Sequence, residues 1–273
     1  MNEFIYFNGV VISAADAKIP AASSASLYGK GIFTTTAICA GESFRWEKHW
    51  RRLTHDAAKI GIDLSEHTEA STRNALEEII GKNGLGDGRA RITFLDERPS
   101  SVWPLQSDKK TSLLITTGDL RAVPDTFRLT ISPYPVNSRS PLAGVKSCNY
   151  LENTLAFDEA KEHGFNEAIR INERGHVTSG CMANVFWLKD GRLYTPSLAT
   201  GCLAGTTREY VMENVECAEV EAEIEVLQEA DTIFLTSTGI GIVEAAEFKG
   251  RKLDPIPQQI KNLNPRKNTK THE

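Results

Sequence analysis

The sequence predicts a globular protein in which helices and strands are mixed and divided between two units. The chain has 273 residues, a length that corresponds to one large or two medium domains. Hydrophobic residues make up 40% and charged residues 25%, the ordinary composition of a globular protein. Segments with helical periodicity and runs rich in β-branched residues occur on both sides of a polar, proline-containing stretch at 118–125.

The first unit, residues 1–118, begins with a predicted β-hairpin. Short apolar runs flank Asn8-Gly9, a dipeptide that favours the tight turns of two-residue hairpins. Beyond it we expect strands at 32–39, 44–46, 89–95 and 112–117 and helices at 47–60 and 66–82. The first of these helices would bury the face that carries Trp50, Leu53 and Ala57.

The second unit, residues 126–273, follows a linker at 119–125. We expect strands near 127–132, 167–171, 184–188, 193–194 and 232–236, and helices at 149–163 and from about Gly205. The tail at 261–273 is polar and basic, and we expect it to be frayed.

Charge and composition narrow the function. The net charge of -5 gives no electrostatic reason to expect a nucleic-acid or acidic-membrane partner. No apolar run reaches the ~18 residues of a membrane span, and the N-terminus carries no secretory signal, so we expect a cytoplasmic protein. The 5 cysteines are widely spaced without a C-x-x-C pair, which favours reduced thiols over disulfides or a metal site.

One lysine, Lys146, ends the apolar, glycine-containing run 141–145 just before a predicted helix. A lysine shielded from bulk water loses its proton more easily and becomes a nucleophilic amine. Such an amine forms Schiff bases with carbonyl compounds, including the aldehyde of pyridoxal phosphate. Lys146 is therefore the candidate nucleophile, and an ordinary solvated charge is the alternative.

Three separate segments have the chemistry of a phosphate site. Gly205, Thr206 and Thr207 open a predicted helix, whose first N–H groups attract anions. Ser237 and Thr238 follow a strand and offer hydroxyl groups, and Arg52 supplies a planar, charged fork. A helix cap, a plain turn and a surface charge are the respective alternatives. Neither glycine segment matches a nucleotide-binding fingerprint.

Several motifs in a fixed order carry a family resemblance. They are Tyr28–Phe33, His49–Leu53, Lys146–Asn153, Asn166–Arg170, Val177–Pro196 and Leu203–Arg208. Together they resemble the class IV, fold type IV enzymes that use pyridoxal 5'-phosphate. These include branched-chain aminotransferases, D-amino-acid aminotransferases and 4-amino-4-deoxychorismate lyases. The resemblance implies a two-domain α+β architecture like that of D-amino-acid aminotransferase, with the cofactor in the interdomain cleft, and a homodimer.

The resemblance also implies roles for residues at matching positions. Lys146 would form the Schiff base and move the substrate proton, and Arg52 would bind the cofactor phosphate. Backbone N–H groups of Gly205, Thr206 and Thr207 and hydroxyls of Ser237 and Thr238 would complete the phosphate site. Asn184 would order the loop near the pyridine ring, unless it is only a turn asparagine. Tyr150 is expected to pack on the helix.

One position departs from the family pattern. The family usually has a glutamate five residues before Asn184, where its carboxylate pairs with the protonated pyridine nitrogen, and here that position is Ser179. A serine hydroxyl offers only a neutral hydrogen bond, so the ring would stabilise a carbanion less well. Ser179 therefore favours an elimination over transamination.

Phe33-Thr34-Thr35 resembles the lyase pattern, in which the second threonine lies beside the cofactor lysine and assists the elimination. The β-propensity of threonine is the alternative explanation, and Ala37 replaces the basic residue usual in the lyases. Arg91 and Arg98 are candidates for binding a substrate carboxylate, or are surface charges.

The sequence thus predicts a lyase of folate biosynthesis that releases pyruvate from 4-amino-4-deoxychorismate to leave 4-aminobenzoate. An aminotransferase for branched-chain or D-amino acids is the alternative. A catalytically weak relative that binds the cofactor is the third hypothesis.

Overall fold

The computed structural model describes residues 1–99 and 110–264. The chain divides into unit 1, Met1–Leu120 with Val145–Asn149, and unit 2, Arg121–Gly144 with Tyr150–Glu273. The division after Leu120 falls inside the expected linker. The segment Val145–Asn149, which the sequence placed in the second domain, belongs instead to unit 1 because its backbone bonds to a strand there.

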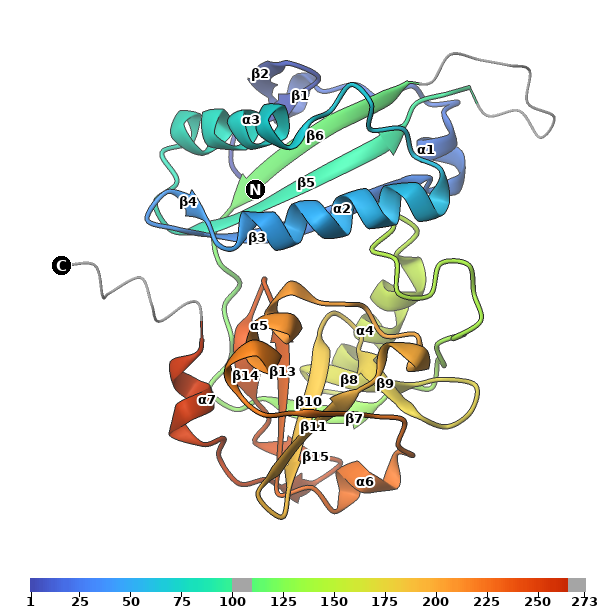
Figure 1. The fold of residues 1–273 in the computed structure, drawn as a ribbon, viewed down its shortest axis with the longest axis vertical. Coiled ribbons are helices and arrows are strands. Elements are labelled where there is room, and N and C mark those ends of the chain that lie inside the picture. The colour runs from blue at the N-terminus through green and yellow to red at the C-terminus, as the bar shows by residue number, and fades with distance from the viewer. Residues whose placement is uncertain (100–109, 265–273) are drawn as a thin grey trace. The chain divides into compact units, whose positions relative to one another are not determined.

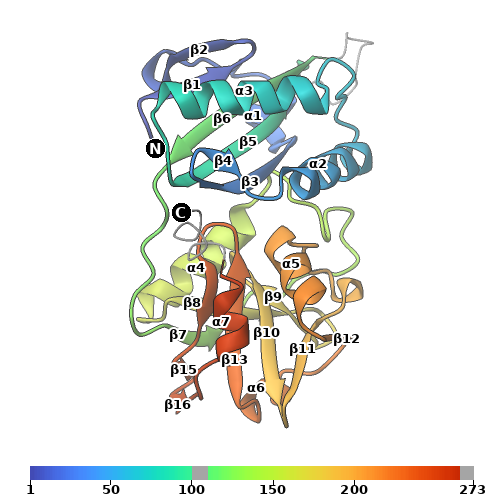
Figure 2. The same ribbon diagram turned by 60° about the vertical axis from the view of Figure 1, so that its left-hand side comes forward.

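Unit 1 contains one antiparallel sheet with strand order β2-β1-β6-β5-β3-β4 (Figure 1). The strands are β1 (Phe4–Phe7), β2 (Val10–Ser13), β3 (Gly31–Cys39), β4 (Glu42–Ser43), β5 (Gly88–Asp96) and β6 (Thr111–Gly118). The helices are α1 (Ser24–Tyr28), α2 (Trp46–Ile60) and α3 (Glu69–Lys82), with a 3-10 turn at Ala14–Asp16. In Figure 2, α2 and α3 lie over the same face of this sheet.

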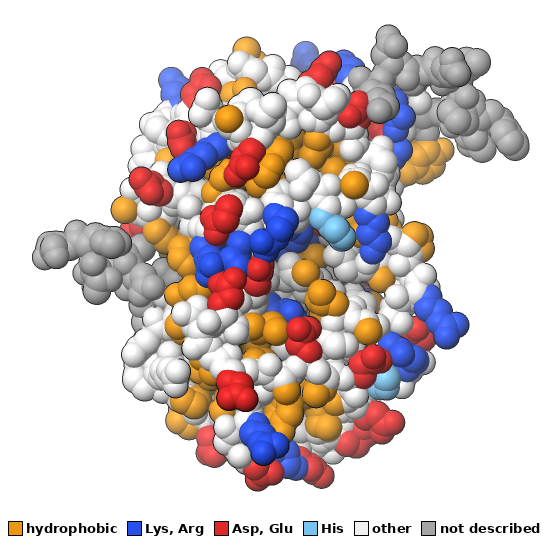
Figure 3. All heavy atoms as spheres, in the orientation of Figure 1, with side chains coloured by type: hydrophobic (Ala, Val, Ile, Leu, Met, Phe, Trp, Pro, Cys, Tyr) orange, Lys and Arg blue, Asp and Glu red, His pale blue; other side chains and the backbone are white. Residues whose placement is uncertain are grey.

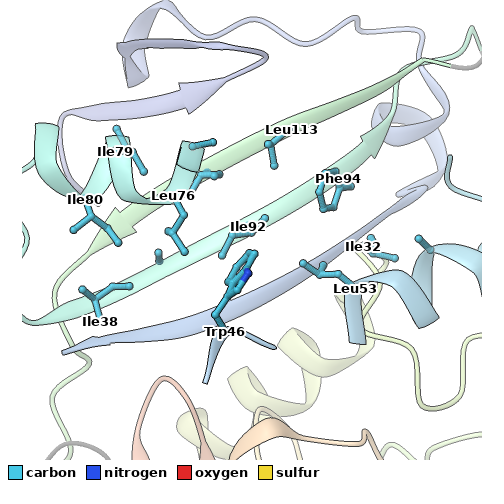
Figure 4. Close-up of a cluster of buried hydrophobic side chains, with 14 of the residues drawn as sticks. Ile32, Ile38, Trp46, Leu53, Leu76, Ile79, Ile80, Ile92, Phe94 and Leu113 are labelled. Atoms are coloured by element: carbon cyan, nitrogen blue, oxygen red, sulfur yellow. The ribbon is translucent and has the colours of Figure 1, made fainter. Parts of the chain in front are cut away.

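The core of unit 1 lies between the sheet and these two helices (Figure 4). Ile32 and Phe94 from the sheet, Leu53 from α2 and Leu76 from α3 are each at most 1% exposed. Because side chains alternate along a strand, burying Ile32 places Thr34 on the helix side of β3 and Phe33 on the opposite face.

Two details of unit 1 differ from the sequence prediction. The strand expected at 44–46 is wrong, because Trp46 begins α2 and β4 ends at Ser43. Arg45, at the N-cap, has φ 56 and ψ 48, a left-handed conformation that interrupts an extended chain. The helix α1 was not predicted, although Ser23 caps it by accepting a hydrogen bond from the Ser26 N–H.

Unit 2 contains two five-stranded sheets, ordered β12-β11-β10-β13-β14 and β16-β15-β7-β8-β9. Their strands are β7 (Arg128–Ile131), β8 (Glu167–Ile171), β9 (Val177–Gly180), β10 (Asn184–Lys189), β11 (Arg192–Pro196), β12 (Ala218–Val220), β13 (Thr232–Ser237), β14 (Gly241–Glu244), β15 (Glu247–Phe248) and β16 (Arg251–Lys252). Leu129 and Ile169 from one sheet and Val185 and Leu235 from the other form a common core.

The helices of unit 2 are α4 (Leu151–Glu162), α5 (Thr206–Asn214), α6 (Glu225–Gln228) and α7 (Gln258–Asn262), with a 3-10 turn at Leu198–Thr200. Leu227 of α6 packs in the common core, whereas α4, α5 and α7 pack on the opposite faces of the two sheets. Val211 of α5 and Ile260 of α7 pack with Phe186 and Phe234 in a second cluster. The predicted frayed tail is wrong at its start, because Lys261 lies in α7; residues 265–273 lie outside the described part.

Acidic and basic side chains are interspersed over the face seen in Figure 3. None of the described helices combines the length and apolar character that crossing a membrane requires.

Candidate active site

Lys146 lies on a short extended segment that runs beside β3 in unit 1. Its C=O accepts a hydrogen bond from the Phe33 N–H at 2.9 Å, and the Cys148 N–H donates to the Gly31 C=O at 2.8 Å. The half-buried Lys146 side chain places Nζ 4.5 Å from the centroid of the Phe33 ring. The amine therefore lies on the Phe33 face of β3, opposite to α2.

Arg91 and Thr35 lie on the same face as Lys146. They are cross-strand partners on β5 and β3, and Thr35 follows Phe33 by two residues, which puts both side chains on one face. The Arg91 guanidinium carbon is 3.6 Å from the Phe33 ring centroid. Lys146 and Arg91 thus share one aromatic ring, an arrangement that cation–π attraction stabilises.

Arg52 is held in place by two side chains of the helix face. Its Nη2 donates to Thr34 Oγ1 at 2.6 Å, and the same hydroxyl oxygen is 2.7 Å from His49 Nδ1. A hydroxyl oxygen can accept two hydrogen bonds, so either Thr34 Oγ1 or His49 Nδ1 can be the donor in their contact. The two contacts together hold the Thr34 hydroxyl beside Arg52.

His49 is 2% exposed, and the sequence did not single it out as a site residue. Burial, followed by the positive charges of Arg52 and Lys146, holds the pKa of His49 well below its usual range. The imidazole is therefore neutral near pH 7.

Arg98 binds a carboxylate of this chain. Its Nε donates to Asp96 Oδ1 at 2.9 Å, and Lys30 Nζ lies 3.0 Å from Asp96 Oδ2. Burial raises the pKa of Asp96, but hydrogen bonds from Arg98 and Lys30 outweigh it, so the pKa lies below its usual value. The guanidinium fork of Arg98 is thus already engaged, whereas Arg91 lies beside Lys146.

In unit 2, α5 begins with an N-terminus that no side chain caps. Gly205 is the N-cap, and Thr206 and Thr207, both buried, are the first helical residues, so neither threonine is the cap itself. The first N–H groups of a helix have no partner within it. This end of α5 therefore offers backbone donors and a positive dipole to an anion.

Asn184 fixes the chain before α5 and lies on strand β10, not in a turn. Its Nδ2 donates to the Leu203 C=O at 2.8 Å. A Cβ at Gly205 would overlap Asn184 Oδ1, so a larger residue there would force the Asn184 side chain to move. Glycine therefore lets the backbone approach Asn184 closely.

The Ser237–Thr238 segment lies beside the same asparagine. Asn184 pairs across the sheet with Thr236, and β13 ends at the next residue, Ser237. Thr236 Oγ1 is buried and has no hydrogen-bond partner among the described residues. An unpaired buried hydroxyl, hydroxyls at a strand end and a bare helix N-terminus form a donor set that fits a phosphate group. The sequence did not single out Thr236.

Ser179 lies on β9 and faces a buried cation across the sheet. Its cross-strand partner is Arg170, whose side chain is 3% exposed. Arg170 donates from Nε to the Tyr134 C=O at 3.2 Å and from Nη2 to the Pro135 C=O at 3.1 Å. The charged residue paired with Ser179 is thus a guanidinium.

The loop that follows β9 is anchored by a buried carboxylate. Glu167 accepts hydrogen bonds from the backbone N–H groups of Ala168, Cys181 and Met182 at 2.8, 2.8 and 2.6 Å. Burial raises the pKa of Glu167, and these three bonds oppose that effect. Glu167 fixes the loop that connects Ser179 with Asn184.

Comparison with known proteins agrees with this geometry. The profile of the family described as amino-transferase class IV matches residues 31–248. The chain belongs to the class IV aminotransferase family. It is therefore an enzyme of that class and has the two-domain, α+β architecture of fold type IV.

Individual members of the class IV family differ in activity. The chain is 26% identical to a branched-chain-amino-acid aminotransferase of Escherichia coli, over 91% of this chain and 85% of the relative. It is 28% identical to an aminodeoxychorismate lyase of Bacillus subtilis, over 88% and 84%. The crystal structure of a branched-chain aminotransferase from Thermoproteus uzoniensis with norvaline matches with a TM-score of 0.91 and 27% identity, covering 100% of this chain and 97% of that chain. Class IV membership alone leaves lyase and aminotransferase open.

Proposed function

We propose that this class IV enzyme uses pyridoxal 5'-phosphate and acts on an amino substrate, with Lys146 as the residue that bonds the cofactor aldehyde. The observation that carries the proposal is the position of the Lys146 amine, over Phe33 and on one face with Arg91 and Thr35. When bound, the cofactor supplies an electron sink for negative charge at the substrate carbon that bears the amino group.

The donor set of unit 2 supports the phosphate part of this proposal. Thr206 and Thr207 would give backbone N–H groups, Gly205 allows the close approach, and Ser237 and Thr238 would give hydroxyls. Within unit 1, Arg52 is the proposed charged phosphate donor, and Thr34 sets its orientation.

We further propose that the reaction is the elimination of pyruvate from 4-amino-4-deoxychorismate, which leaves 4-aminobenzoate. Lys146 would accept the proton lost from the substrate carbon, Thr35 would orient the substrate beside that amine, and Arg91 would bind a substrate carboxylate. We prefer Arg91 to Arg98 because Arg91 shares the Phe33 ring with Lys146 and pairs across the sheet with Thr35. Ser179 supports elimination, since it cannot supply the negative charge that keeps the pyridine ring protonated.

An aminotransferase for branched-chain or D-amino acids is the second candidate, and the Escherichia coli relative favours it. One paired assay separates the two. Purified holoenzyme is supplied with 4-amino-4-deoxychorismate, and pyruvate and 4-aminobenzoate are measured. In parallel, amino transfer to 2-oxoglutarate is measured with branched-chain and D-amino acids. Transfer without elimination reverses the order of the two candidates.

Binding of the cofactor has its own test. Reduction with borohydride followed by peptide mass spectrometry should find the pyridoxyl group on Lys146, and Lys146→Ala should lose it. A protein that takes up no cofactor would refute both enzymatic candidates. We also propose a homodimer, which sedimentation equilibrium would establish or refute.

A further inference from the structure

Asp56 is a buried carboxylate that the proposed chemistry does not use. Its side chain is 2% exposed, and Oδ1 lies 3.1 Å from Nδ1 of the exposed His55 ring. Its other oxygen, Oδ2, accepts the backbone N–H of Lys146 at 3.0 Å across a sequence separation of 90 residues. The bond is therefore a tertiary connection between helix α2 and the segment that carries Lys146.

This bond completes the fixation of the Lys146 main chain. The Lys146 C=O accepts from Phe33 on one side, and the Lys146 N–H donates to Asp56 on the other. Ile32 and Ser147 form a β-bridge, so the next residue is also in register with β3. With both backbone groups bonded, the direction in which the Lys146 side chain leaves the chain is set.

The same helix face also controls Arg52. His49, Arg52 and Asp56 follow one another at spacings of three and four residues, which places them on one face of α2. Arg52 is held through Thr34 and His49, and Asp56 holds Lys146. One helix therefore orients the proposed phosphate-binding arginine and the backbone of the proposed nucleophile together.

We infer that Asp56 is a positioning residue for Lys146. The Asp56 carboxylate fixes the Lys146 backbone relative to Arg52, so that the amine stands at a set distance from the group that binds the phosphate. An apolar side chain at position 56 would leave the Lys146 N–H buried without an acceptor and release the segment from α2. The consequence for cofactor bonding rests on the proposed function; the consequence for the Lys146 backbone does not.

Three variants test this inference. Asp56→Leu removes the acceptor but keeps a side chain of similar length, and Asp56→Asn keeps an acceptor without the charge. Leu76→Ala, a buried residue of α3, is the control for general loss of stability in unit 1. Two quantities are measured: hydrogen exchange of the amides at 145–148 in the cofactor-free protein, and the fraction of protein that borohydride traps as a pyridoxyl adduct at fixed cofactor concentration.

We expect Asp56→Leu to speed hydrogen exchange of the Lys146 amide by about tenfold or more. This factor corresponds to the free-energy cost of leaving a buried N–H without an acceptor. The trapped fraction should fall with it, whereas Asp56→Asn should stay close to wild type. Leu76→Ala should lower the denaturation midpoint without selective exchange at 145–148. Unchanged exchange in Asp56→Leu overturns the inference, and so does an Asp56→Asn protein that behaves like Asp56→Leu.

The two measurements, hydrogen exchange and borohydride trapping, distinguish a failure of this inference from a failure of the proposed function. If wild type yields no adduct at Lys146, the proposed function fails, while selective exchange in Asp56→Leu still supports the role of Asp56 in fixing the Lys146 backbone. If wild type yields the adduct and Asp56→Leu yields it equally at every cofactor concentration, the positioning role is overturned and the proposed function stands.

Discussion

At the scale of single residues, the sequence motifs pointed to groups that react or bind, and the structure adds the groups that hold them. Lys146 and Arg52 stand in recognisable motifs. Their partners Asp56, Thr34 and His49 act through tertiary hydrogen bonds, and the sequence carries no signal for such contacts. Thr34 illustrates the point, because the sequence predicts no site role of its own for it and it proves to contact both Arg52 and His49.

Ser179 gives a prediction that tests the choice between lyase and aminotransferase. Ser179→Glu places a carboxylate where the family usually has one, so amino transfer should rise by about tenfold relative to elimination, through a more often protonated ring. The cross-strand Arg170 would compete for that carboxylate, which limits the gain. Both rates are measured in Ser179→Glu and in the uncharged control Ser179→Gln. Equal ratios in the two variants would contradict the electron-sink argument.

The Thr34 hydroxyl gives a second prediction. Thr34→Val keeps the shape of the side chain but removes the group that connects Arg52 with His49. Cofactor affinity should fall by roughly tenfold, the cost of one charge-assisted hydrogen bond, as measured by titration with pyridoxal phosphate. Thr36→Val, on the same strand face but bonded to Ser43, is the control. Equal losses in both variants would remove the case for a specific link to Arg52.

At the scale of elements, His49 of helix α2 should make the free energy of unfolding depend on pH. The pKa of His49 in the folded protein lies well below 6.5, so below pH 6.5 the unfolded chain binds a proton that the folded chain does not. The free energy of unfolding should therefore fall as the pH drops below 6.5, by up to about 1.4 kcal/mol per pH unit from this group. Denaturant unfolding at pH 5 to 7.5 should show a smaller decline in His49→Asn than in wild type. The exposed His55→Asn serves as control, and a wild-type slope in His49→Asn would refute the assignment.

The turn before α5 supplies the clearest steric prediction. In Gly205→Ala the new methyl group would overlap Asn184 Oδ1, so Asn184 must move and its bond to Leu203 is lost. We expect a loss of about 2 kcal/mol or more in unfolding free energy, together with weaker cofactor binding. Gly81→Ala in α3 is the matched control, because no atom lies within 4 Å of its Cβ position and the helix should gain about 1 kcal/mol. A Gly205→Ala protein with unchanged stability and affinity would contradict this view of the turn.

At the scale of the whole molecule, periodicity predicted most long helices and strands, but it misplaced the chain's most informative segment. The sequence put Lys146 in the second domain because its motif precedes a helix of that domain. The structure assigns Val145–Asn149 to unit 1, since Val145 enters the core there and Phe33, Gly31 and Asp56 bind its backbone. Such assignments depend on long-range contacts, which local patterns do not contain.

The position of Lys146 in unit 1 and of the proposed phosphate donors of α5 in unit 2 leads to a last prediction. A ligand that binds only the folded state stabilises it, by about 2.7 kcal/mol at a hundredfold excess over its dissociation constant. Pyridoxal phosphate should therefore slow hydrogen exchange of the amides near both sets of proposed binding residues. These are residues 145–148 in unit 1 and the first turn of α5 in unit 2. Lys146→Ala should lose most of the protection at 145–148 and keep that of α5, because the proposed phosphate donors are intact. Pyridoxine, which lacks both the phosphate and the aldehyde, is the control ligand. Protection confined to one unit in the wild-type protein would mean that the residues proposed in the other unit do not bind the cofactor.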